Sequence, residues 1–308
     1  MKKKNVPPSV IVAGTIALDD VRTPFGAVKR ALGGSATFAA LGCALFEKPG
    51  IASVVGNDFP AEHIQLFQQK GIDTQGIEIR KLEKTFHWKG EYGMDLNNAK
   101  TIRTDLNVVE NFDLQLPTLY REAPFLFLGN LDPEIQLNII KQMKQRPKIV
   151  IADSMNLWIS TKREKVLDVI QNVDLFLLNE IEARQLFNIS SLKKAANELL
   201  KLGLKNAIIK KGEHGCISFT KDTHFACPGY PLENIMDPTR SGDSFGGSLL
   251  GYLSKTEDFS EKNMRKAIVF ASCVASYNAE GFSVNRLKTI GVKEIRQRYN
   301  EFQKIAKF

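Results

Sequence analysis

The sequence has no apolar run long enough to cross a membrane. Its longest apolar stretches, such as residues 125–128 and 149–152, are far shorter than the roughly 20 residues of a membrane helix. A signal peptide is not indicated either, because Val6-Pro7-Pro8 interrupts the basic N-terminus and ordinary fold sequence follows from Val10. These absences predict a cytoplasmic protein without a membrane partner.

Cysteine is scarce and is not arranged for metal binding. The chain has four cysteines and no C-x-x-C pair among Cys43, Cys216, Cys227 and Cys273. Such spacing is typical of reduced thiols that pack in a core, and it provides no framework for a structural metal ion.

Several catalytic fingerprints are also missing. The chain has no G-x-G-x-x-G, which argues against a dinucleotide-dependent oxidoreductase, and no G-K-[S/T], so it has no Walker-type phosphate loop. It also lacks H-E-x-x-H, the zinc-binding motif of metalloproteases. Residues 242–246 do match the G-x-S-x-G elbow of serine hydrolases. A hydrolase with that elbow needs a histidine after its serine, whereas all four histidines, the last of them His224, precede Ser244.

Basic residues outnumber acidic ones, but they are not concentrated. The formal net charge is +8, yet the only dense basic run is Lys2-Lys3-Lys4 and the other Lys and Arg residues are dispersed. We therefore predict no nucleic-acid partner. With 43% hydrophobic and 25% charged residues, the 308-residue chain has the composition of a globular protein, and we expect one domain over residues 1–308.

From about residue 120 the sequence alternates short apolar runs with amphipathic stretches. The apolar runs predict strands at residues 125–128, 149–152, 175–178 and 207–209. The amphipathic stretches predict helices at residues 133–144, 162–170, 181–187 and 192–202. Continuous apolar strands are typical of a mostly parallel sheet covered by helices on both faces, so we expect an α/β fold.

The N-terminal third has a different pattern. Residues 10–13 predict a buried strand, whereas residues 16–32 predict two strands joined around Pro24-Phe25-Gly26. A second extended region covers residues 81–105, with alternation at Thr85-Phe86-His87-Trp88 and a break at Asn97-Asn98. These two segments, approximately 16–32 and 81–105, predict a small β-sheet lid outside the α/β body.

The most informative motif is a polar loop at residues 237–243 that leads into an apolar helix rich in small residues. At the start of that helix the backbone amides of Ser241, Gly242 and Asp243 would be unpaired and suited to a developing phosphate charge. Asp243 would lie beside this anion hole as a catalytic base for phosphoryl transfer. In the alternative interpretation, Asp243 only caps the helix and the glycines that follow only allow close packing.

This motif, together with Ala31-Leu32-Gly33-Gly34-Ser35, resembles the ribokinase-like (PfkB) family of carbohydrate and nucleoside kinases over essentially the whole chain. The resemblance implies a three-layer α/β/α fold with a mostly parallel central sheet. It also implies that Gly33 and Gly34 line the substrate site, that Asp19 holds substrate hydroxyls, and that Asp243 is the base within the anion hole formed by Ser241, Gly242 and Asp243.

Two further motifs fit the same family. Residues 179–182 match its N-x-x-E motif, which implies that Asn179 and Glu182 organise Mg²⁺ and phosphate through water; otherwise Asn179 is a helix N-cap. Residues 210–215 look like the nucleotide-phosphate turn, with Lys210 beside the donor phosphates and Gly212 and Gly215 in the turn; otherwise they form a surface hairpin. The resemblance also implies ATP with its adenine near residues 271–281.

Two positions depart from the family pattern. Arg240 stands where the family usually has glycine, and it would either bind a second anion on the acceptor or point outward into solvent. Phe38 stands where many members have asparagine, and it could stack on a nucleobase or cover an apolar ring, unless it belongs to the core.

The function expected from these residues is that of an ATP-dependent kinase for a hydroxyl of a small carbohydrate. A nucleoside kinase and a sensor that binds sugar or nucleotide without turnover remain as alternatives. Many family members also bind a monovalent cation, and a K⁺ site would map near Asp237, Thr239 and Gly281. An open lid edge further predicts a possible homodimer.

Overall fold

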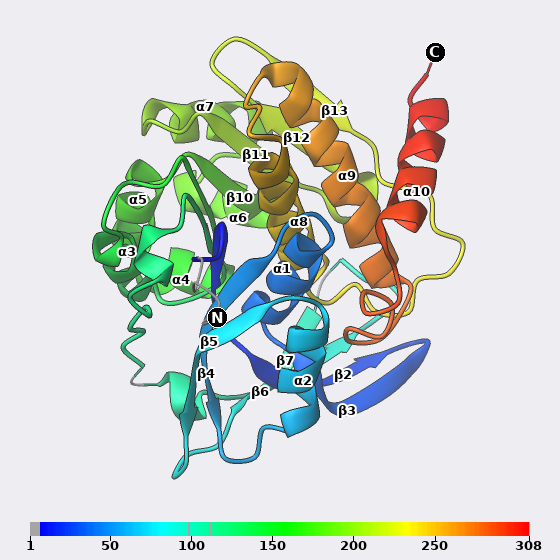
Figure 1. Cartoon of the computed structure of the whole chain (residues 1–308). Coiled ribbons are helices and arrows are strands. Elements are labelled where there is room, and N and C mark those ends of the chain that lie inside the picture. The colour runs from blue at the N-terminus through cyan, green and yellow to red at the C-terminus, as the bar shows by residue number, and fades with distance from the viewer. Residues whose placement is uncertain (1–6, 98, 111, 308) are drawn as a thin grey trace, which may run out of the picture.

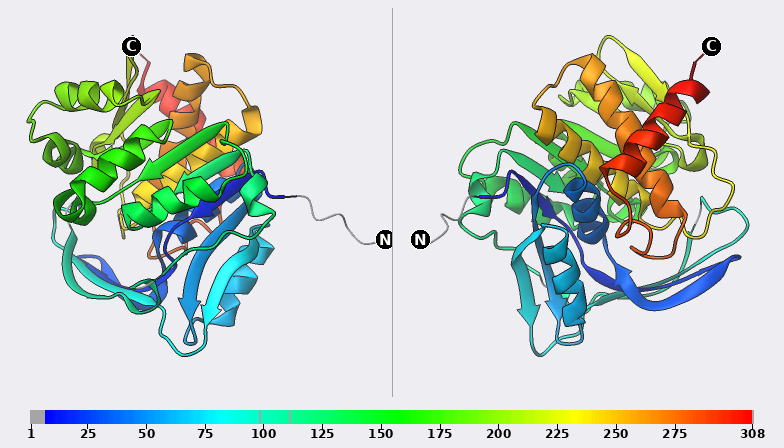
Figure 2. Two further views of the ribbon diagram at one scale, coloured as in Figure 1. Left: turned by 90° about the vertical axis from the view of Figure 1, so that its left-hand side faces the viewer. Right: turned by 45° about the vertical axis from the view of Figure 1, so that its right-hand side comes forward.

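The computed structural model describes residues 7–97, 99–110 and 112–307. The basic run Lys2-Lys3-Lys4 and Asn98 of the expected Asn97-Asn98 break lie outside the described residues. Within the described residues, two sheets are present, a large one in the body and a small one along one edge of it (Figures 1 and 2).

The large sheet has nine strands in the described part of the chain, in the order β13-β12-β11-β10-β9-β8-β1-β4-β5. From β11 to β5 the neighbouring strands are parallel, and β12 and β13 add antiparallel strands at one edge. The strands are β1 (Val10–Ala13), β4 (Pro49–Gly56), β5 (Asp73–Arg80), β8 (Phe125–Leu128), β9 (Ile149–Asp153), β10 (Leu175–Asn179), β11 (Asn206–Lys210), β12 (Cys216–Phe219) and β13 (His224–Cys227).

Helices cover both faces of this sheet. One layer contains α1 (Ser35–Ala44), α8 (Ser241–Thr256), α9 (Glu261–Ala279) and α10 (Val292–Ile305), and α1, α8 and α9 lie side by side in Figure 1. The opposite layer contains α3 (Pro133–Gln142), α4 (Asn156–Thr161), α5 (Arg163–Gln171), α6 (Glu180–Phe187) and α7 (Leu192–Lys201). Helix α2 (Ala61–Gln69) packs beside β5, and 3₁₀ turns occur at Asn107–Val109, Tyr120–Glu122 and Gly212–His214.

Side-chain alternation along the central strands explains the two layers. In β1, Val10 and Val12 belong to the core beneath α1 and α8, whereas Ile11 and Ala13 belong to the core beneath α3 to α7. All four side chains are fully buried, as expected for a parallel strand with helices on both faces. The expected three-layer α/β/α fold with a mostly parallel sheet is therefore confirmed.

The packing of α8 on α1 depends on glycine. A Cβ atom at Gly247 would lie 2.0 Å from the carbonyl oxygen of Ala39, so no side chain fits there. This close approach brings the N-terminal turn of α8 over the carboxyl ends of the sheet strands. The packing interpretation of the glycines after Asp243 is correct for Gly247, and it does not conflict with a catalytic role for the loop before them.

The small sheet has the order β3-β2-β6-β7, with β2 (Ala17–Thr23), β3 (Gly26–Gly33), β6 (Phe86–Tyr92) and β7 (Ala99–Asp105). It therefore combines both segments expected to form the lid, and the turn between β2 and β3 contains Pro24 and Phe25. The pairs β2–β3 and β6–β7 are antiparallel, while β2 and β6 are parallel. Asp58 connects this sheet to the body, because it accepts a hydrogen bond from the Thr85 amide at 2.7 Å and pairs with Arg30 at 2.9 Å.

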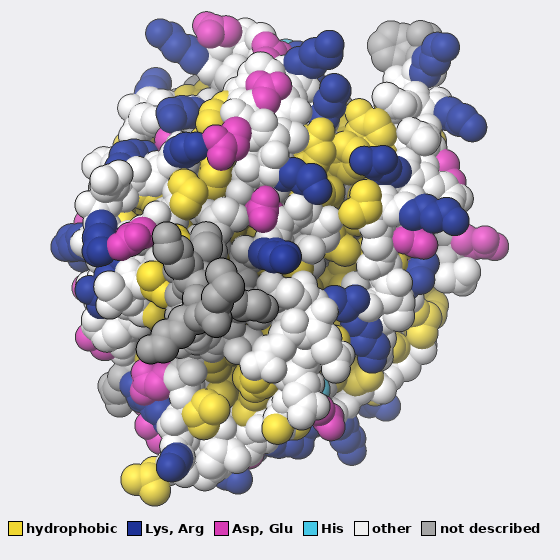
Figure 3. Space-filling view, viewed as in Figure 1, with side chains coloured by type: hydrophobic (Ala, Val, Ile, Leu, Met, Phe, Trp, Pro, Cys, Tyr) yellow, Lys and Arg dark blue, Asp and Glu magenta, His cyan; other side chains and the backbone are white. Residues whose placement is uncertain are grey.

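The surface in Figure 3 carries Lys and Arg side chains that are scattered and interspersed with acidic ones on the face shown. Among the described helices, none combines the length and the apolar character that a membrane crossing requires.

Candidate active site

The carboxyl ends of three parallel strands place polar side chains at one edge of the large sheet. Asp153 is the last residue of β9, Asn179 is the last of β10, and Lys210 is the last of β11. Neighbouring parallel strands end at the same edge, and Asn179 pairs in register with Lys210. Each strand continues one residue beyond the apolar run that predicted it, and that extra residue is polar.

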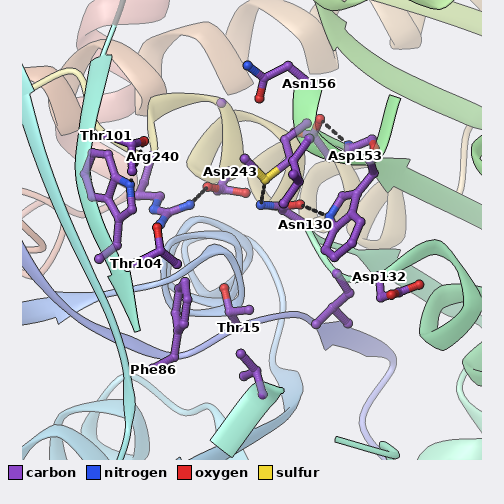
Figure 4. A pocket seen from close by; sticks show the side chains of 18 of the residues that line it. Thr15, Phe86, Thr101, Thr104, Asn130, Asp132, Asp153, Asn156, Arg240 and Asp243 are labelled. Atoms are coloured by element: carbon purple, nitrogen blue, oxygen red, sulfur yellow. Dashed lines mark hydrogen bonds and ion pairs between the residues drawn. The ribbon is translucent and has the colours of Figure 1, made fainter. Parts of the chain in front are cut away.

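A cavity of about 1030 Å³ opens at this edge, between the body and the small sheet (Figure 4). Its polar end is lined by Asp153, Asn179, Glu182, Lys210, Arg240, Gly242 and Asp243. Its other walls mix apolar and aromatic side chains with polar and acidic ones. The apolar ones include Phe86 and Trp88 of the small sheet, Leu106, Val109 and Phe112 from the segment after β7, and Leu131, Met155 and Trp158 from the body, and the acidic ones are Glu110, Asp113, Asp132 and Glu134. A large cavity that combines aromatic side chains with a cluster of charged groups at one end is typical of a small-molecule site.

Asp243 lies in the first turn of α8 at the polar end, with 8% of its surface exposed. The Ser241 amide donates to the carbonyl of Pro238 at 3.1 Å, and the Ser244 amide donates to the carbonyl of Arg240 at 3.0 Å. Of the three amides expected to form the anion hole, that of Ser241 is therefore already used, which corrects the expectation for this residue. Among the described residues, the Gly242 and Asp243 amides have no acceptor outside the helix, so they can face an anion at the positive end of the helix dipole.

The charge of Asp243 depends on several neighbours. Burial raises the pKa of Asp243 to about 6, and the acids Asp153 and Asp19 act in the same direction. Arg240 and Lys210 lower it. The carboxylate is thus mainly ionised at neutral pH and more basic than an exposed aspartate, as a general base requires.

Lys210 lies inside the site and does not extend into solvent. Its Nζ donates to Asp153 Oδ2 at 2.7 Å, and a Cβ atom at Gly242 would lie only 2.9 Å from the same Nζ. Although burial opposes its charge, Asp153 and Glu182 raise the pKa of Lys210 above its ordinary value. A fixed cation therefore lies beside the free amides of α8.

Asn179 and Glu182 form the start of α6. The Asn179 side chain accepts from the Glu182 amide at 2.8 Å, and Glu182 Oε2 accepts from the Asn179 amide at 2.8 Å. The helix-capping interpretation of Asn179 is therefore correct, while both side chains also line the cavity. Burial raises the pKa of Glu182 to about 7, with Asp153 and Asp243 acting in the same direction and Lys210 against it.

The side-chain oxygens of Asn179 and Glu182 fit a magnesium ion whose remaining ligands are water and substrate phosphates. Among the described residues, no group of three or more His, Cys, Asp or Glu side chains could hold a metal ion by itself. The polar end offers a few carboxylate and amide oxygens, and Mg²⁺ commonly takes one or two carboxylates, with water and substrate phosphates completing its shell.

Arg240 directly precedes α8 and points into the cavity toward Asp243 (Figure 4). Its guanidinium lies 3.6 Å from Asp19, 4.0 Å from Asp243 and 5.8 Å from the centre of the Trp88 ring. The outward, solvated interpretation of Arg240 is therefore wrong.

The early Gly-Gly pair serves the chain's own packing. A Cβ atom at Gly33 would lie 2.2 Å from Asp19 Oδ2, and one at Gly34 would lie 2.3 Å from the carbonyl oxygen of Thr15. Gly33 thus makes room for the Asp19 carboxylate, and Gly34 makes room for the backbone of the segment that leads into β2. Burial raises the pKa of Asp19, which is 3% exposed, while Arg240 lowers it.

Phe38 does not reach the cavity. It is 2% exposed and belongs to the core cluster beneath α1 and α8, and it is absent from the cavity walls. Every residue of α1 from Ser35 to Cys43 is buried, so an aromatic residue there fills the core. This position corrects the interpretation of Phe38 as a ring that stacks on substrate.

Gly212 and Gly215 adopt positive φ angles of 57° and 83° in the turn between β11 and β12. A Cβ atom at Gly215 would lie 2.1 Å from the carbonyl oxygen of Cys227, which explains glycine there. Neither residue lines the cavity, so their contact with the nucleotide remains a prediction.

Several cavity residues were not identified from the sequence. Asp153 is one, although a polar residue directly after a buried apolar run was a usable signal. Asn130 is another; its side chain accepts from the Trp158 indole at 2.9 Å (Figure 4). Tyr92, from the small sheet, accepts a hydrogen bond from the Thr239 hydroxyl at 3.1 Å, and this contact joins the small sheet to the loop before α8.

Comparisons with known proteins agree with this geometry. A family model described as pfkB family carbohydrate kinase matches residues 15–287. A cytidine kinase from Thermococcus kodakarensis is 28% identical over 250 residues, which cover 79% of this chain and 88% of that protein.

Solved structures show the same fold. A nucleoside kinase from Methanocaldococcus jannaschii, an archaeal member of the ribokinase family, aligns with a TM-score of 0.77 at 19% identity over 96% of this chain and 99% of its own. A fructokinase from Vibrio cholerae, solved with fructose, ADP and calcium, aligns with a TM-score of 0.76 at 17% identity over 94% and 99% of the two chains. The chain therefore belongs to the pfkB family of carbohydrate kinases, sugar and nucleoside kinases that transfer a phosphoryl group to an alcohol.

Proposed function

We propose that this protein transfers the γ-phosphoryl group of ATP to a hydroxyl of a small carbohydrate, with Asp243 as the catalytic base. The observation that carries the proposal is the position of Asp243, a buried carboxylate of raised pKa that lies beside two free amides and Lys210 at one end of a large cavity. Phosphoryl transfer requires a base for the attacking hydroxyl and fixed positive groups for the phosphoryl oxygens.

In this mechanism the acceptor hydroxyl lies against Asp243, which takes its proton as the oxygen attacks the γ-phosphorus in line. The bond from that phosphorus to the bridging oxygen breaks, and ADP leaves with the electron pair. The Gly242 and Asp243 amides and the Lys210 ammonium stabilise the charge that spreads over the phosphoryl oxygens. Asp153 holds Lys210 in this position through the 2.7 Å hydrogen bond.

Membership of the family implies ATP and a divalent metal ion. When bound, Mg²⁺ would neutralise charge on the donor phosphates. Asn179 and Glu182 are the residues that would hold it through water, and they are fixed for this task by their mutual capping hydrogen bonds. We place the adenine near residues 271–281, beside the turn that contains Gly212 and Gly215.

The small sheet would act as a lid over the acceptor. Phe86 and Trp88 form part of the cavity wall, and the contact of Tyr92 with Thr239 ties the sheet to the catalytic loop. Closure over the acceptor excludes water and so limits wasteful hydrolysis of ATP. Asp19 of β2 and Gly33 of β3 belong to this same sheet, and with Gly34 they would hold the acceptor hydroxyls.

A nucleoside acceptor is the second candidate, and the walls of the cavity favour it. A simple sugar has few apolar atoms, whereas Trp88, Phe112 and Trp158 offer aromatic surface beyond the polar end. The T. kodakarensis relative is a cytidine kinase, and the M. jannaschii neighbour is a nucleoside kinase.

Three further assignments belong to the proposal. Asp237, Thr239 and Gly281 would frame a K⁺ site, since the Asp237 amide already donates to the carbonyl of Ala279 and the two loops therefore meet. The exposed edge of the small sheet would support a homodimer. We place the protein in the cytoplasm, where ATP and Mg²⁺ are available.

The test is release of ADP by the purified protein with ATP and Mg²⁺ against a panel of sugars and nucleosides. A kinase phosphorylates at least one acceptor, and the product is identified by mass spectrometry. The alternative is a sensor without turnover: it would show acceptors that raise the melting temperature while none is ever phosphorylated, and this result would refute the proposal.

A further inference from the structure

Arg240 has a backbone conformation that residues with a side chain rarely adopt. Its φ and ψ angles are 65° and 10°, in the left-handed region, directly before α8. Glycine reaches this region without strain, and the family signature usually has glycine at this position. This chain therefore has a large cationic side chain at a position whose backbone conformation favours glycine. Residues strained in this way concentrate at functional sites.

The side chain of Arg240 is held between the lid and the body. It is 16% exposed. Its guanidinium lies near the Trp88 ring and the Asp19 carboxylate, which are paired neighbours on β6 and β2 of the small sheet, and near the Asp243 carboxylate of the body. Trp88 is itself fixed, because its indole donates to Thr101 at 3.2 Å and its ring lies so close over Gly90 that a Cβ atom there would be 2.0 Å away. A rigid aromatic face thus orients the guanidinium.

Two polar atoms in this arrangement lack partners within the described residues. The Nε atom of Arg240 and the Oδ1 atom of Asp19 are buried and make no hydrogen bond. Asp19 is 3% exposed, so its free oxygen cannot rely on bulk water. Buried donors and acceptors are rarely left unpaired in native proteins. One free donor beside one free acceptor matches a ligand with neighbouring hydroxyls, since a hydroxyl both donates and accepts.

The charges around Arg240 argue against an anionic acceptor. A phosphate or carboxylate that approached the guanidinium would also face Asp19 and Asp243, both within 4.0 Å of Arg240. The positive charge of Arg240 is therefore already balanced by two carboxylates, so Arg240 offers no net positive charge to a phosphate or carboxylate of the acceptor. A neutral polyhydroxyl group meets no such repulsion.

We propose that Arg240 is a specificity-determining residue that, together with Asp19, binds neighbouring hydroxyl groups of an uncharged acceptor. This assignment builds on the proposed function, because it names the charge class of the acceptor in the same site. The contact of Arg240 with Trp88 also links acceptor binding to the position of the lid.

The test is calorimetric binding without ATP. The neutral probes are ribose, fructose, cytidine and inosine, and the anionic probes are gluconate and ribose 5-phosphate. Wild-type protein should bind at least one neutral probe and neither anionic one. Arg240→Gly should weaken the neutral probe by about tenfold to a hundredfold, the loss expected for a hydrogen bond to a charged group, and added guanidinium ion should restore part of it. Arg240→Lys keeps the charge without the planar fork and should restore only part of the binding.

A matched control exists at the other end of α8. Glu257 also has a left-handed φ, of 47°, so Glu257→Gly makes the same backbone change away from the cavity and should leave binding unchanged. Both glycine variants should fold, since glycine suits these angles. The assignment would be overturned if Arg240→Gly bound the neutral probe with an affinity within twofold of wild type. It would also be overturned if wild-type protein bound only the anionic probes. Arg240-dependent binding of a neutral probe that is never phosphorylated would support it while refuting the kinase proposal.

Discussion

Replacing Asp243 by Asn removes a buried negative charge that the folded state disfavours, so the inactive variant should be more stable than wild type. Burial raises the pKa of Asp243 to about 6 from an ordinary value of 3.8. At about 1.4 kcal/mol per pKa unit, the ionised carboxylate costs the folded state about 3 kcal/mol at pH 8. For a chain of this length, that free energy corresponds to a rise in Tm of about 5 °C.

The sign of the pH dependence makes this prediction specific. A carboxyl whose pKa is raised in the folded state destabilises the fold only where it is ionised, so the cost begins above about pH 4 and is complete above about pH 6. Urea unfolding at pH 8 and pH 4 should therefore show Asp243→Asn more stable than wild type at pH 8 and equal to it at pH 4. Asp168→Asn is the control, because Asp168 is about half exposed and should show no such gain.

The reasoning would be refuted by a variant that is less stable than wild type at pH 8, since Asp243 would then stabilise the fold as a helix cap. Equal stability differences at pH 8 and pH 4 would also contradict it, because the carboxylate charge could not then be the cause.

Three further predictions follow from the same geometry. The acidic limb of kcat/KM should fall about tenfold per pH unit below about pH 6, because the base must be ionised; a flat profile down to pH 4.5 would contradict this. Lys210→Met should raise the KM for ATP by about tenfold or more and lower the free energy of unfolding by roughly 3 kcal/mol, because Asp153 is left buried without its cation; initial rates and urea titration measure both. Gly247→Ala should cost roughly 1–3 kcal/mol in the same titration, because its methyl group would meet Ala39 at 2.0 Å, whereas Gly93→Ala, with open space around it, should be neutral.

The central strands could be predicted from the sequence because each is an unbroken apolar run. Because a strand was predicted only as far as its apolar run, three of the predicted strands end one residue before the observed ones. Asp153, Asn179 and Lys210 still belong to their strands, but their polarity resembles the start of a loop. Hydrophobic pattern identifies the residues that the helices cover, whereas the polar residues that line the cavity lie just beyond the covered part of each strand.

Asp243 and the capping pair at the start of α6 could also be predicted, because helix starts have strong local signals. The hydrogen bond from the Ser241 amide to the carbonyl of Pro238 could not be predicted, because it depends on how the loop around Pro238 folds. Phe38 was misjudged because a helix buried on all sides has no polar face to show which residues point toward a ligand.

The direction of Arg240 is a tertiary property. Its left-handed backbone aims the side chain at the cavity, and the Trp88 ring that it faces comes from a segment about 150 residues earlier in the chain. No local sequence pattern predicts a contact between residues so far apart in the chain. The sequence shows an arginine where glycine is expected, but only the folded structure shows that its side chain points into the cavity.

Asp243 is the catalytic base of the proposed phosphoryl transfer. Single-turnover transfer of labelled phosphate from ATP to the acceptor, measured beside ATP binding, tests this role for Asp243→Asn. We predict a fall in transfer rate of about 10²–10⁴-fold with an ATP Kd within about twofold of wild type. A variant that keeps more than a tenth of the wild-type rate, or that loses ATP affinity as strongly as it loses rate, would contradict the assignment.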